Sequence, residues 1–495
     1  MAREVPPCRI APPNPVVGGR LERQVIDVLI ASLCAGYLVS ALVGLPLYAD
    51  GAHYLFRIIV DGQPYVPDGR LTAVLPQVPA FLSAQLGTDL ALLRLIFSLA
   101  YASLPALSLL GCWLLVRRRA PGLMVFPALA ALLNQINFSG VSELLAVLYL
   151  TWPLLIALLL WPRHWGPRAA AWIAGPLLVW LHPAAAAACF ALAVLVYLLH
   201  RAERCESKAL PALALWLLGC TVARLVLSGV DMSAYEAAHV QGRGAVAYMA
   251  TQTWAQHALL AVTAGLGPLI AWDRLKGDRA AAAAPLLARF AAVVLAVIVC
   301  LLAYEFLWGQ GIRLKAGLTF IVAGALMLCA GIVALRLRPR DAQPPQPGAY
   351  RWTLVTATSL LGVVCLLAVK SSAWWTATRG LQNVISDSTR ACIPHLRQAP
   401  FGLQWPWMAI VDEWNAPMNA LLFRSGYREP GHDEPAPIPL LLPRDGCERL
   451  NRDGVAYMTD WLPISWTILD ERLGPLRPLS DRPQPTKEMA NERAR

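Results

Sequence analysis

The sequence predicts an all-α polytopic membrane protein with about 11 transmembrane helices and a small C-terminal extracytoplasmic domain. Of its 495 residues, 57% are hydrophobic and only 15% are charged, and the mean hydropathy is +0.50. The apolar residues fall in repeated runs of about twenty, the length that a helix needs to cross a hydrocarbon core. A helix satisfies its own backbone hydrogen bonds, so these runs are expected to cross lipid as helices.

The basic residues indicate the orientation of the chain. Short clusters of Lys and Arg lie between the apolar runs, as in cytoplasmic loops beside anionic lipid. The net charge of +11 therefore does not indicate nucleic-acid binding. The asymmetry predicts an N-terminus inside the cell and a C-terminus outside. The abundance of Ala, Arg, Pro and Leu is typical of a high-GC genome, so we expect the cytoplasmic (inner) membrane of a bacterium.

The first apolar run is expected to be a signal anchor. Residues 1–24 are polar, basic and Pro-rich, and we interpret them as a cytoplasmic tail. The run Val25–Leu47 is too long for the apolar region of a cleavable signal peptide. Ten further spans are expected at Leu90–Val116, Leu123–Asn134, Leu144–Leu160, Ala169–Leu181, Ala184–Leu199, Leu210–Leu227, His257–Trp272, Phe290–Leu307, Ala316–Leu335 and Trp352–Val369.

Within this transmembrane domain, residues 25–370, the first external loop covers residues 49–89. Its second half, Leu71–Leu86, is apolar but interrupted by Pro76 and Pro79. That segment is short and broken for a span, so we expect a helix lying along the outer interface. The outgoing third and fifth spans are also short. Their turns are expected in the outer leaflet or along a cavity, where irregular backbone is tolerated.

The composition changes after residue 370. Residues 371–478 are polar and rich in Trp and Pro, and they are long enough for a small external domain. Residues 479–495 are charged and Pro-rich, so a disordered tail is expected. Cys392 and Cys447 both fall in the external region, where a disulfide can persist. None of the eleven cysteines has the spacing of a zinc site, so no structural metal is expected.

Candidate chemistry is concentrated in Tyr48–Arg57, directly after the first span. If Asp50–Ile59 is helical, then Asp50, His53, Tyr54 and Arg57 share one face. A carboxylate at a partly dry membrane surface can act as a general base for a hydroxyl. The alternative is that Asp50 only caps the helix, a role that Asp favours.

The same stretch resembles a known family. Tyr48-Ala-Asp-Gly-Ala-His-Tyr-Leu, followed by Arg57 and Asp61-Gly62-Gln63, is similar to the first outer loop of GT-C superfamily membrane glycosyltransferases. In the branch of the protein O-mannosyltransferases and lipid A aminoarabinose transferases, this loop reads Asp-Glu-x-x-Tyr. The family's essential acid corresponds to Asp50. The usual Glu is replaced by Gly51, which leaves one carboxylate instead of two and leaves metal use open.

The resemblance implies an inverting transfer of a sugar from a polyprenyl-phosphate donor to a lipid, glycan or protein acceptor at the outer face. Asp50 would deprotonate the acceptor hydroxyl, and no cofactor is implied apart from the undecided divalent metal. The donor phosphate needs cations, and arginine matches phosphate oxygens with a forked, permanent charge. The candidates are Arg313 and Lys315 before the tenth span, Arg224 inside an apolar run, and Arg57.

Each of these candidates has a plainer interpretation. Arg224 is a functional candidate because an intramembrane charge is costly, but it can also snorkel to the outer interface. Lys315 can contact lipid phosphates. Glu143, at the outer start of the fourth span, is either a second acid or a helix-dipole partner. His182, in a tight turn before Pro183, is either a supporting polar group or a cap.

Two other functions compete with the enzyme. A transporter or flippase would place charges and broken helices near the bilayer midplane. Here the acids cluster in outer loops, which favours an enzyme working at the outer surface. The third alternative is a non-catalytic assembly partner whose Trp-rich region binds another protein.

Overall fold

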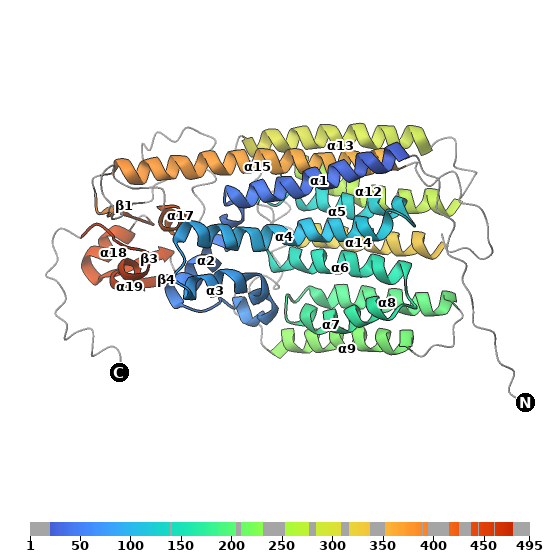
Figure 1. The fold of residues 1–495 in the computed structure, drawn as a ribbon, viewed down its shortest axis with the longest axis horizontal. Helices are drawn as coiled ribbons and strands as arrows, with labels where there is room; N and C mark the ends of the chain where they lie inside the picture. The colour runs from blue at the N-terminus through green and yellow to red at the C-terminus, as the bar shows by residue number, and fades with distance from the viewer. Residues whose placement is uncertain are drawn as a thin grey trace, which may run out of the picture.

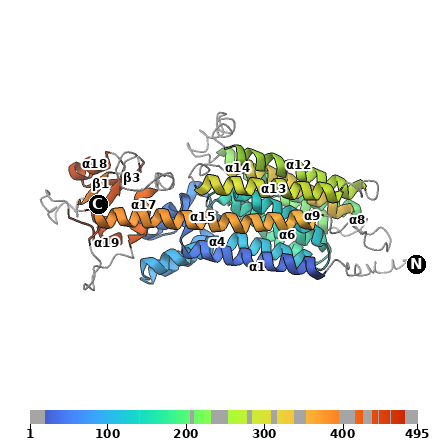
Figure 2. The same ribbon diagram turned by 90° about the horizontal axis from the view of Figure 1, so that it is seen from above.

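The computed structural model is an elongated helical bundle with a small mixed region at one end (Figure 1). The description that follows covers residues 20–138, 141–203, 209–230, 253–276, 284–307, 316–336, 352–388, 390–394, 415–424, 437–443, 445–459 and 461–478. Figure 2 shows α15 running along the bundle and continuing beyond it toward the mixed region.

A helix covers each of the eleven expected spans. These helices are α1 (Arg20–Leu42), α4 (Leu90–Val116), α5 (Val125–Asn134), α6 (Glu143–Leu160), α7 (Trp165–Val179), α8 (Ala185–Glu203), α9 (Ala209–Val230), α12 (Trp254–Lys276), α13 (Ala284–Leu307), α14 (Ala316–Arg336) and α15 (Thr353–Asp387). Within the described residues, seven of them are long and apolar enough to cross a membrane: α1, α4, α6, α9, α12, α13 and α15. Shorter apolar helices correspond to α5, α8 and α14.

The outer surface of the bundle is apolar, as expected for helices in lipid. Large side chains that would be buried in a soluble protein are exposed on several helices, for example Leu107, Val293 and Leu361. Contiguous exposed apolar surface of this kind marks a membrane or interaction surface. The fold class is therefore that of a helical membrane protein.

Helix α5 is too short to cross a bilayer by itself. It has 10 residues, and at a rise of about 1.5 Å per residue it spans only about half of a 30 Å hydrocarbon core. The 3₁₀ turn η4 (Pro121–Met124) precedes it. The turn that follows α5 lies inside the bundle, where Asn134 and Asn137 line a cavity. The expectation of an internal, cavity-lining turn is confirmed here.

The segment expected as the first external loop, residues 49–89, is mostly helical in the structure. After η1 (Leu45–Leu47), it contains α2 (Asp50–Asp61), η2 (Pro67–Gly69), η3 (Leu71–Gln77) and α3 (Val78–Gln85). The expected helix at Asp50 is confirmed, and the segment Leu71–Leu86 is helical in two pieces. The exposed leucines of this segment are Leu71, Leu75, Leu82 and Leu86. These leucines are four, seven and four residues apart, a spacing that favours one apolar face. A helix that lies in the membrane interface needs such a face.

Helix α15 continues past the expected boundary at residue 370. It has no break until Asp387, because Ser371–Asp387 contains no proline and carries its own buried stripe. Trp374, Ala377, Leu381 and Ile385 are buried at three- and four-residue spacing. The Trp374 ring contacts Phe423. The outer part of this helix therefore packs against the C-terminal elements.

The C-terminal elements gather at the end of the bundle that carries α2 and α3 (Figure 1). They are β1 (Cys392–Pro394), α17 (Ala416–Leu422), β2 (Leu440–Leu442), α18 (Gly446–Asp453), β3 (Val455–Thr459), β4 (Leu462–Ser465) and α19 (Trp466–Leu473). Strands β1 and β2 pair in parallel, and β3 and β4 pair antiparallel. Helices α17 and α19 both contact α2.

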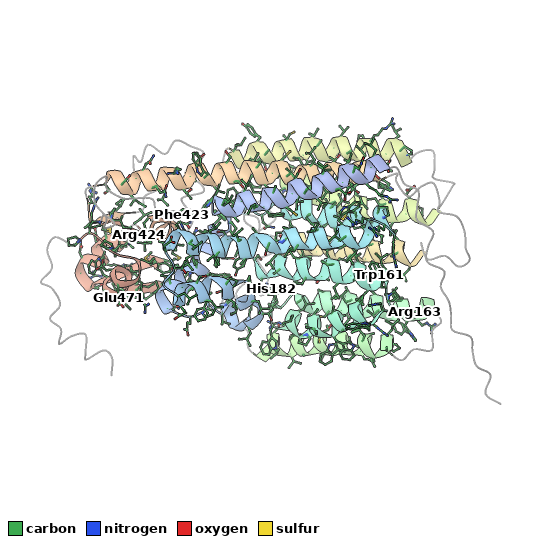
Figure 3. The ribbon with its side chains drawn as sticks, viewed as in Figure 1. Trp161, Arg163, His182, Phe423, Arg424 and Glu471 are labelled. Carbon is green, nitrogen blue, oxygen red and sulfur yellow. A yellow bond between two sulfur atoms is a disulfide. The ribbon has the colours of Figure 1, made fainter. Side chains whose placement is uncertain are left out.

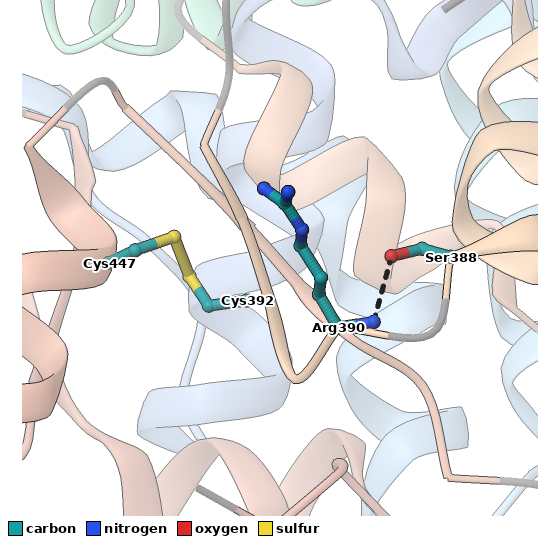
Figure 4. The surroundings of a disulfide bond; sticks show 4 residues. All are labelled: Ser388, Arg390, Cys392 and Cys447. Atoms are coloured by element: carbon teal, nitrogen blue, oxygen red, sulfur yellow. Dashed lines mark hydrogen bonds between the residues drawn. A yellow bond between two sulfur atoms is a disulfide. The ribbon is translucent and has the colours of Figure 1, made fainter.

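A disulfide joins Cys392 of β1 to Cys447 of α18, with sulfurs 2.06 Å apart and Cα atoms 5.7 Å apart (Figure 4). Beside it, the backbone N–H of Arg390 donates to the Ser388 hydroxyl at 3.2 Å. The pairing expected from the sequence is confirmed. It fastens the strand that follows α15 to the second half of the C-terminal region.

Candidate active site

A buried carboxylate, Glu143, lies at the centre of the candidate site. It is the first residue of α6, and 8% of its surface is exposed. The Tyr54 hydroxyl donates to Glu143 Oε1. Arg70 Nη1 donates to Glu143 Oε2 at 3.3 Å. The first external loop thus reaches across to the start of the fourth expected span and holds its acid from two sides.

Helix α2 begins in a tight turn that fixes the position of Asp50. Gly44 has a left-handed backbone, and Ala49 has φ 52°, a conformation that is uncommon for a residue with a side chain. A Cβ added at Gly51 would lie 1.8 Å from the carbonyl oxygen of Pro46. The start of α2 therefore packs directly on η1. This close approach explains why glycine, and not glutamate, follows Asp50.

Asp50 is the exposed acid of the site. The N-cap residue of α2 is Ala49, so Asp50 belongs to the first turn and does not cap the helix. A carboxylate in the first turn is stabilised by the helix dipole. Burial raises the pKa of the Tyr54 phenol well above its usual value, and the charges of Glu143 and Asp50 raise it further. Both carboxylates therefore lie near one phenol.

His53 packs beside Tyr54, with their ring centroids 6.2 Å apart. Its ring centroid lies 4.8 Å from that of Tyr65 and 5.2 Å from that of Trp461. Burial, with a contribution from the Arg57 charge, lowers the His53 pKa to about 4. The imidazole is neutral at physiological pH. It connects α2 to Trp461, which lies between β3 and β4.

Arg57 lies toward the end of α2, away from Glu143. Its Nε lies 2.5 Å from Asp61 Oδ2, and its guanidinium lies over the Tyr65 ring, 5.5 Å from the centroid. Both members of the ion pair are partly exposed. The Tyr65 ring contacts His53, Tyr54 and Arg57, as expected for residues on one face of α2. The phosphate-binding role of Arg57 stays a prediction.

The turn between α7 and α8 forms the next wall of the site. The backbone N–H of Ala184 donates to His182 Nδ1 at 3.1 Å, so His182 does act as a cap. Its neutral ring carries the proton on Nε2. Burial, together with the charges of Arg70 and Arg224, lowers the His182 pKa to about 3. In Figure 3, His182 lies at the end of the α7–α8 pair that faces the first loop.

Two arginines flank this histidine. Arg224 of α9 is 6% exposed, and its Nη1 donates to the Val179 carbonyl at 3.2 Å. It therefore binds the interior of the protein instead of extending to the surface. Arg70 is also buried and belongs to the first loop, whose Thr72 N–H donates to the Trp180 carbonyl at 3.1 Å. Arg70 and Arg224 give the site a positive side next to its two acids, and the His182 ring between them is neutral.

The sequence prediction missed Arg70. Only a few cations lie on the expected outer side of the membrane, and Arg70 is one of them. Their small number could have identified Arg70 as a candidate. Arg313 and Lys315, the other predicted phosphate ligands, lie outside the described residues. Within those residues, no group of three or more His, Cys, Asp or Glu side chains could hold a metal ion.

No protein-family model, curated protein or solved structure matches this chain. The chemical interpretation therefore depends on the geometry. The site has an exposed carboxylate, a second carboxylate held by a phenol and a guanidinium, and two buried arginines around a neutral imidazole. This set can accept a proton at Asp50 and can stabilise an anion beside the arginines.

Proposed function

We propose that the protein is an inverting membrane glycosyltransferase that moves a sugar from a polyprenyl-phosphate donor to an acceptor at the outer face of a bacterial cytoplasmic membrane. The observation that carries the proposal is that Tyr54 and Arg70 both hold Glu143, while Asp50 lies one helical turn before Tyr54 on α2. The resemblance of the first loop to GT-C enzymes supports the same reaction class.

The proposed reaction is a single displacement. Asp50 takes the proton from the acceptor hydroxyl, and the resulting oxygen attacks the anomeric carbon of the sugar. The bond from that carbon to the phosphate oxygen breaks, and polyprenyl phosphate leaves with the bonding electrons. Arg70 and Arg224 stabilise the negative charge on the leaving phosphate. Glu143 holds Arg70 and Tyr54 in place.

The proposed topology places this reaction outside. All eleven helices that match expected spans cross the membrane, the N-terminus is inside, and residues 371–478 include an external domain. The cytoplasmic cluster Arg117–Arg119 follows α4. Figure 3 places Trp161 and Arg163 at the end of the bundle opposite Phe423 and Glu471. The Cys392–Cys447 disulfide favours an oxidising compartment for the C-terminal elements.

A cellular experiment tests the proposal. Wild type and Asp50→Asn are expressed in a strain that lacks the gene, and lipid-linked sugars and surface glycans are extracted and compared. Asp453→Asn, an exposed acid on α18, is the matched control. We expect Asp50→Asn to accumulate the lipid-linked donor and lose one glycan modification, while Asp453→Asn restores it. Normal glycans in Asp50→Asn would refute the catalytic role of Asp50.

The transporter or flippase remains the second candidate because of one buried cation. Lys370 of α15 is 2% exposed and lies inside an apolar helix. Charges at such positions often mark transport pathways. A transporter would move a labelled lipid-linked substrate across liposomes without changing it. Recovery of the unchanged substrate on the opposite side, with no new glycoside, would favour this candidate.

A further inference from the structure

A second polar site lies beneath the first loop, inside the helical bundle. A cavity there is lined by side chains from α1, α4, α6, α15 and the α5–α6 turn, among them Tyr37, Tyr101, Asn134, Asn137, Tyr149 and Lys370. Pro46 and Val141 also line it, and the same two residues are the nearest neighbours of a Cβ built at Gly51. The cavity therefore lies directly below the turn that carries Asp50.

Lys370 determines the charge of this cavity. Its Nζ donates to the Gln135 carbonyl at 3.0 Å, to Gln135 Oε1 at 2.7 Å and to the Asn137 carbonyl at 2.9 Å. These bonds use all three N–H donors of the ammonium group. They also place the cation at the C-terminal end of α5, where the helix dipole is favourable. Lys370 therefore has no N–H left for a phosphate group.

The cavity groups that can still bind a ligand by hydrogen bonds are uncharged. Asn134 is 5% exposed, and its Oδ1 has no hydrogen-bond partner in the described part of the chain. A buried acceptor without a donor costs about 1–3 kcal/mol, so this oxygen favours a ligand that brings an O–H or N–H group. The phenols of Tyr37, Tyr101 and Tyr149 can each donate and accept. Groups of this kind can form hydrogen bonds with the hydroxyls of a ligand.

We propose that this cavity is a specificity pocket that receives a hydroxyl-bearing substituent of the donor sugar, with Asn134 Oδ1 as the acceptor. The inference rests on the proposed function, because the sugar must be presented at Asp50 directly above. The interior is small, with about 30 Å³ of room for water-sized groups. This volume can hold one or two hydroxyl groups, and it is too small for a complete second ligand. The phosphate stays with Arg70 and Arg224, and Lys370 holds the lining of the pocket in place.

A binding experiment on the full-length protein in lipid nanodiscs tests the pocket. The probes are polyprenyl phosphate alone and polyprenyl phosphate carrying a hexose, a pentose or an N-acetylhexosamine. Wild type is expected to bind one of the sugar-bearing lipids at least tenfold more tightly than the bare lipid. Asn134→Leu is expected to lose about tenfold in affinity for that lipid, the effect of one lost hydrogen bond, and to bind the bare lipid normally. Asn383→Leu, an exposed amide on α15, is the matched control.

The design separates the two proposals. Normal binding of the bare lipid shows that Asn134→Leu is folded, and Tyr149→Phe, which removes only a hydroxyl, provides a milder second variant. If both variants keep the wild-type preference for the sugar-bearing lipid, the cavity holds only water and the pocket is refuted. The same follows if wild type binds no sugar-bearing lipid better than the bare one. If wild type binds none of the lipids, the proposed function itself fails.

Discussion

Tyr54 donates a hydrogen bond to Glu143, a residue 89 positions later in the chain. This bond connects the first external loop to the start of α6. Because the pKa of Tyr54 is raised well above its usual value, the phenol keeps its proton at physiological pH and acts as a donor. The loop that carries Asp50 is thereby fixed to the bundle through the second acid of the site.

Removal of the Tyr54 hydroxyl is expected to loosen this connection. Tyr54→Phe removes one buried, charge-assisted hydrogen bond from Glu143 and keeps the bond from Arg70. Such a loss costs about 1–3 kcal/mol, so the thermal midpoint in detergent should fall. Tyr197→Phe, an exposed tyrosine on α8, is the control. Equal midpoints for the two variants would contradict a structural role for this bond.

Gly51 is expected to tolerate no side chain. In Gly51→Ala the new Cβ would meet the Pro46 carbonyl oxygen, so the start of α2 must shift. We expect a loss of about 1–3 kcal/mol, as for overpacked core positions, and reduced activity because Asp50 moves. Gly219→Ala, in α9 with open space around the new Cβ, should be neutral or slightly stabilising. Full stability and activity of Gly51→Ala would show that the contact between η1 and α2 is looser than described.

The disulfide is expected to stabilise the C-terminal region. Cys392 and Cys447 are 55 residues apart, and closing a loop of that length contributes about 4 kcal/mol in the chain-entropy model. Cys447→Ser or mild reduction should therefore expose the region to limited proteolysis, while the bundle stays resistant. Cys300→Ser, an exposed free cysteine on α13, serves as the control. Identical digestion patterns with and without reductant would contradict the prediction.

The buried histidines predict a stability that falls in acid. The pKa of His53 is about 4 and that of His182 about 3 in the fold, against about 6.5 in an unfolded chain. The unfolded state therefore binds more protons below pH 6.5, and stability decreases as pH falls from 6.5 toward 4. The slope should be at most about 1.4 kcal/mol per pH unit for each histidine. His53→Gln should reduce the slope of the thermal midpoint against pH, and an unchanged slope would contradict the prediction.

Sequence reasoning located the helices because each apolar run has the length and composition of a span. It also located α2, because the polar residues of Asp50–Ile59 have helical spacing. The expected boundary at residue 370 falls inside α15, which continues to Asp387. Lys370 and the two serines after it resemble the end of a membrane span. In the structure Lys370 is buried, and it donates hydrogen bonds to Gln135, 235 positions earlier in the chain.

The site was predicted in part. Asp50, Tyr54, Glu143, His182 and Arg224 were all named from the sequence, and the structure brings them to one region. Arg70 was missed, because its contact with Glu143 spans 73 positions and depends on the path of η2 and η3. The glycine at position 51 had no explanation in the sequence alone. It follows from the contact with Pro46, which only the folded turn reveals.

The most direct test of the central claim is the rate of sugar transfer by purified protein in liposomes, with labelled polyprenyl-phosphate sugars and an extract of candidate acceptors. Loss of a general base lowers a rate by about 10²–10⁴-fold. Asp50→Asn should show a decrease of that size with unchanged donor binding, and Asp453→Asn should match wild type. Transfer at the wild-type rate by Asp50→Asn would contradict the account.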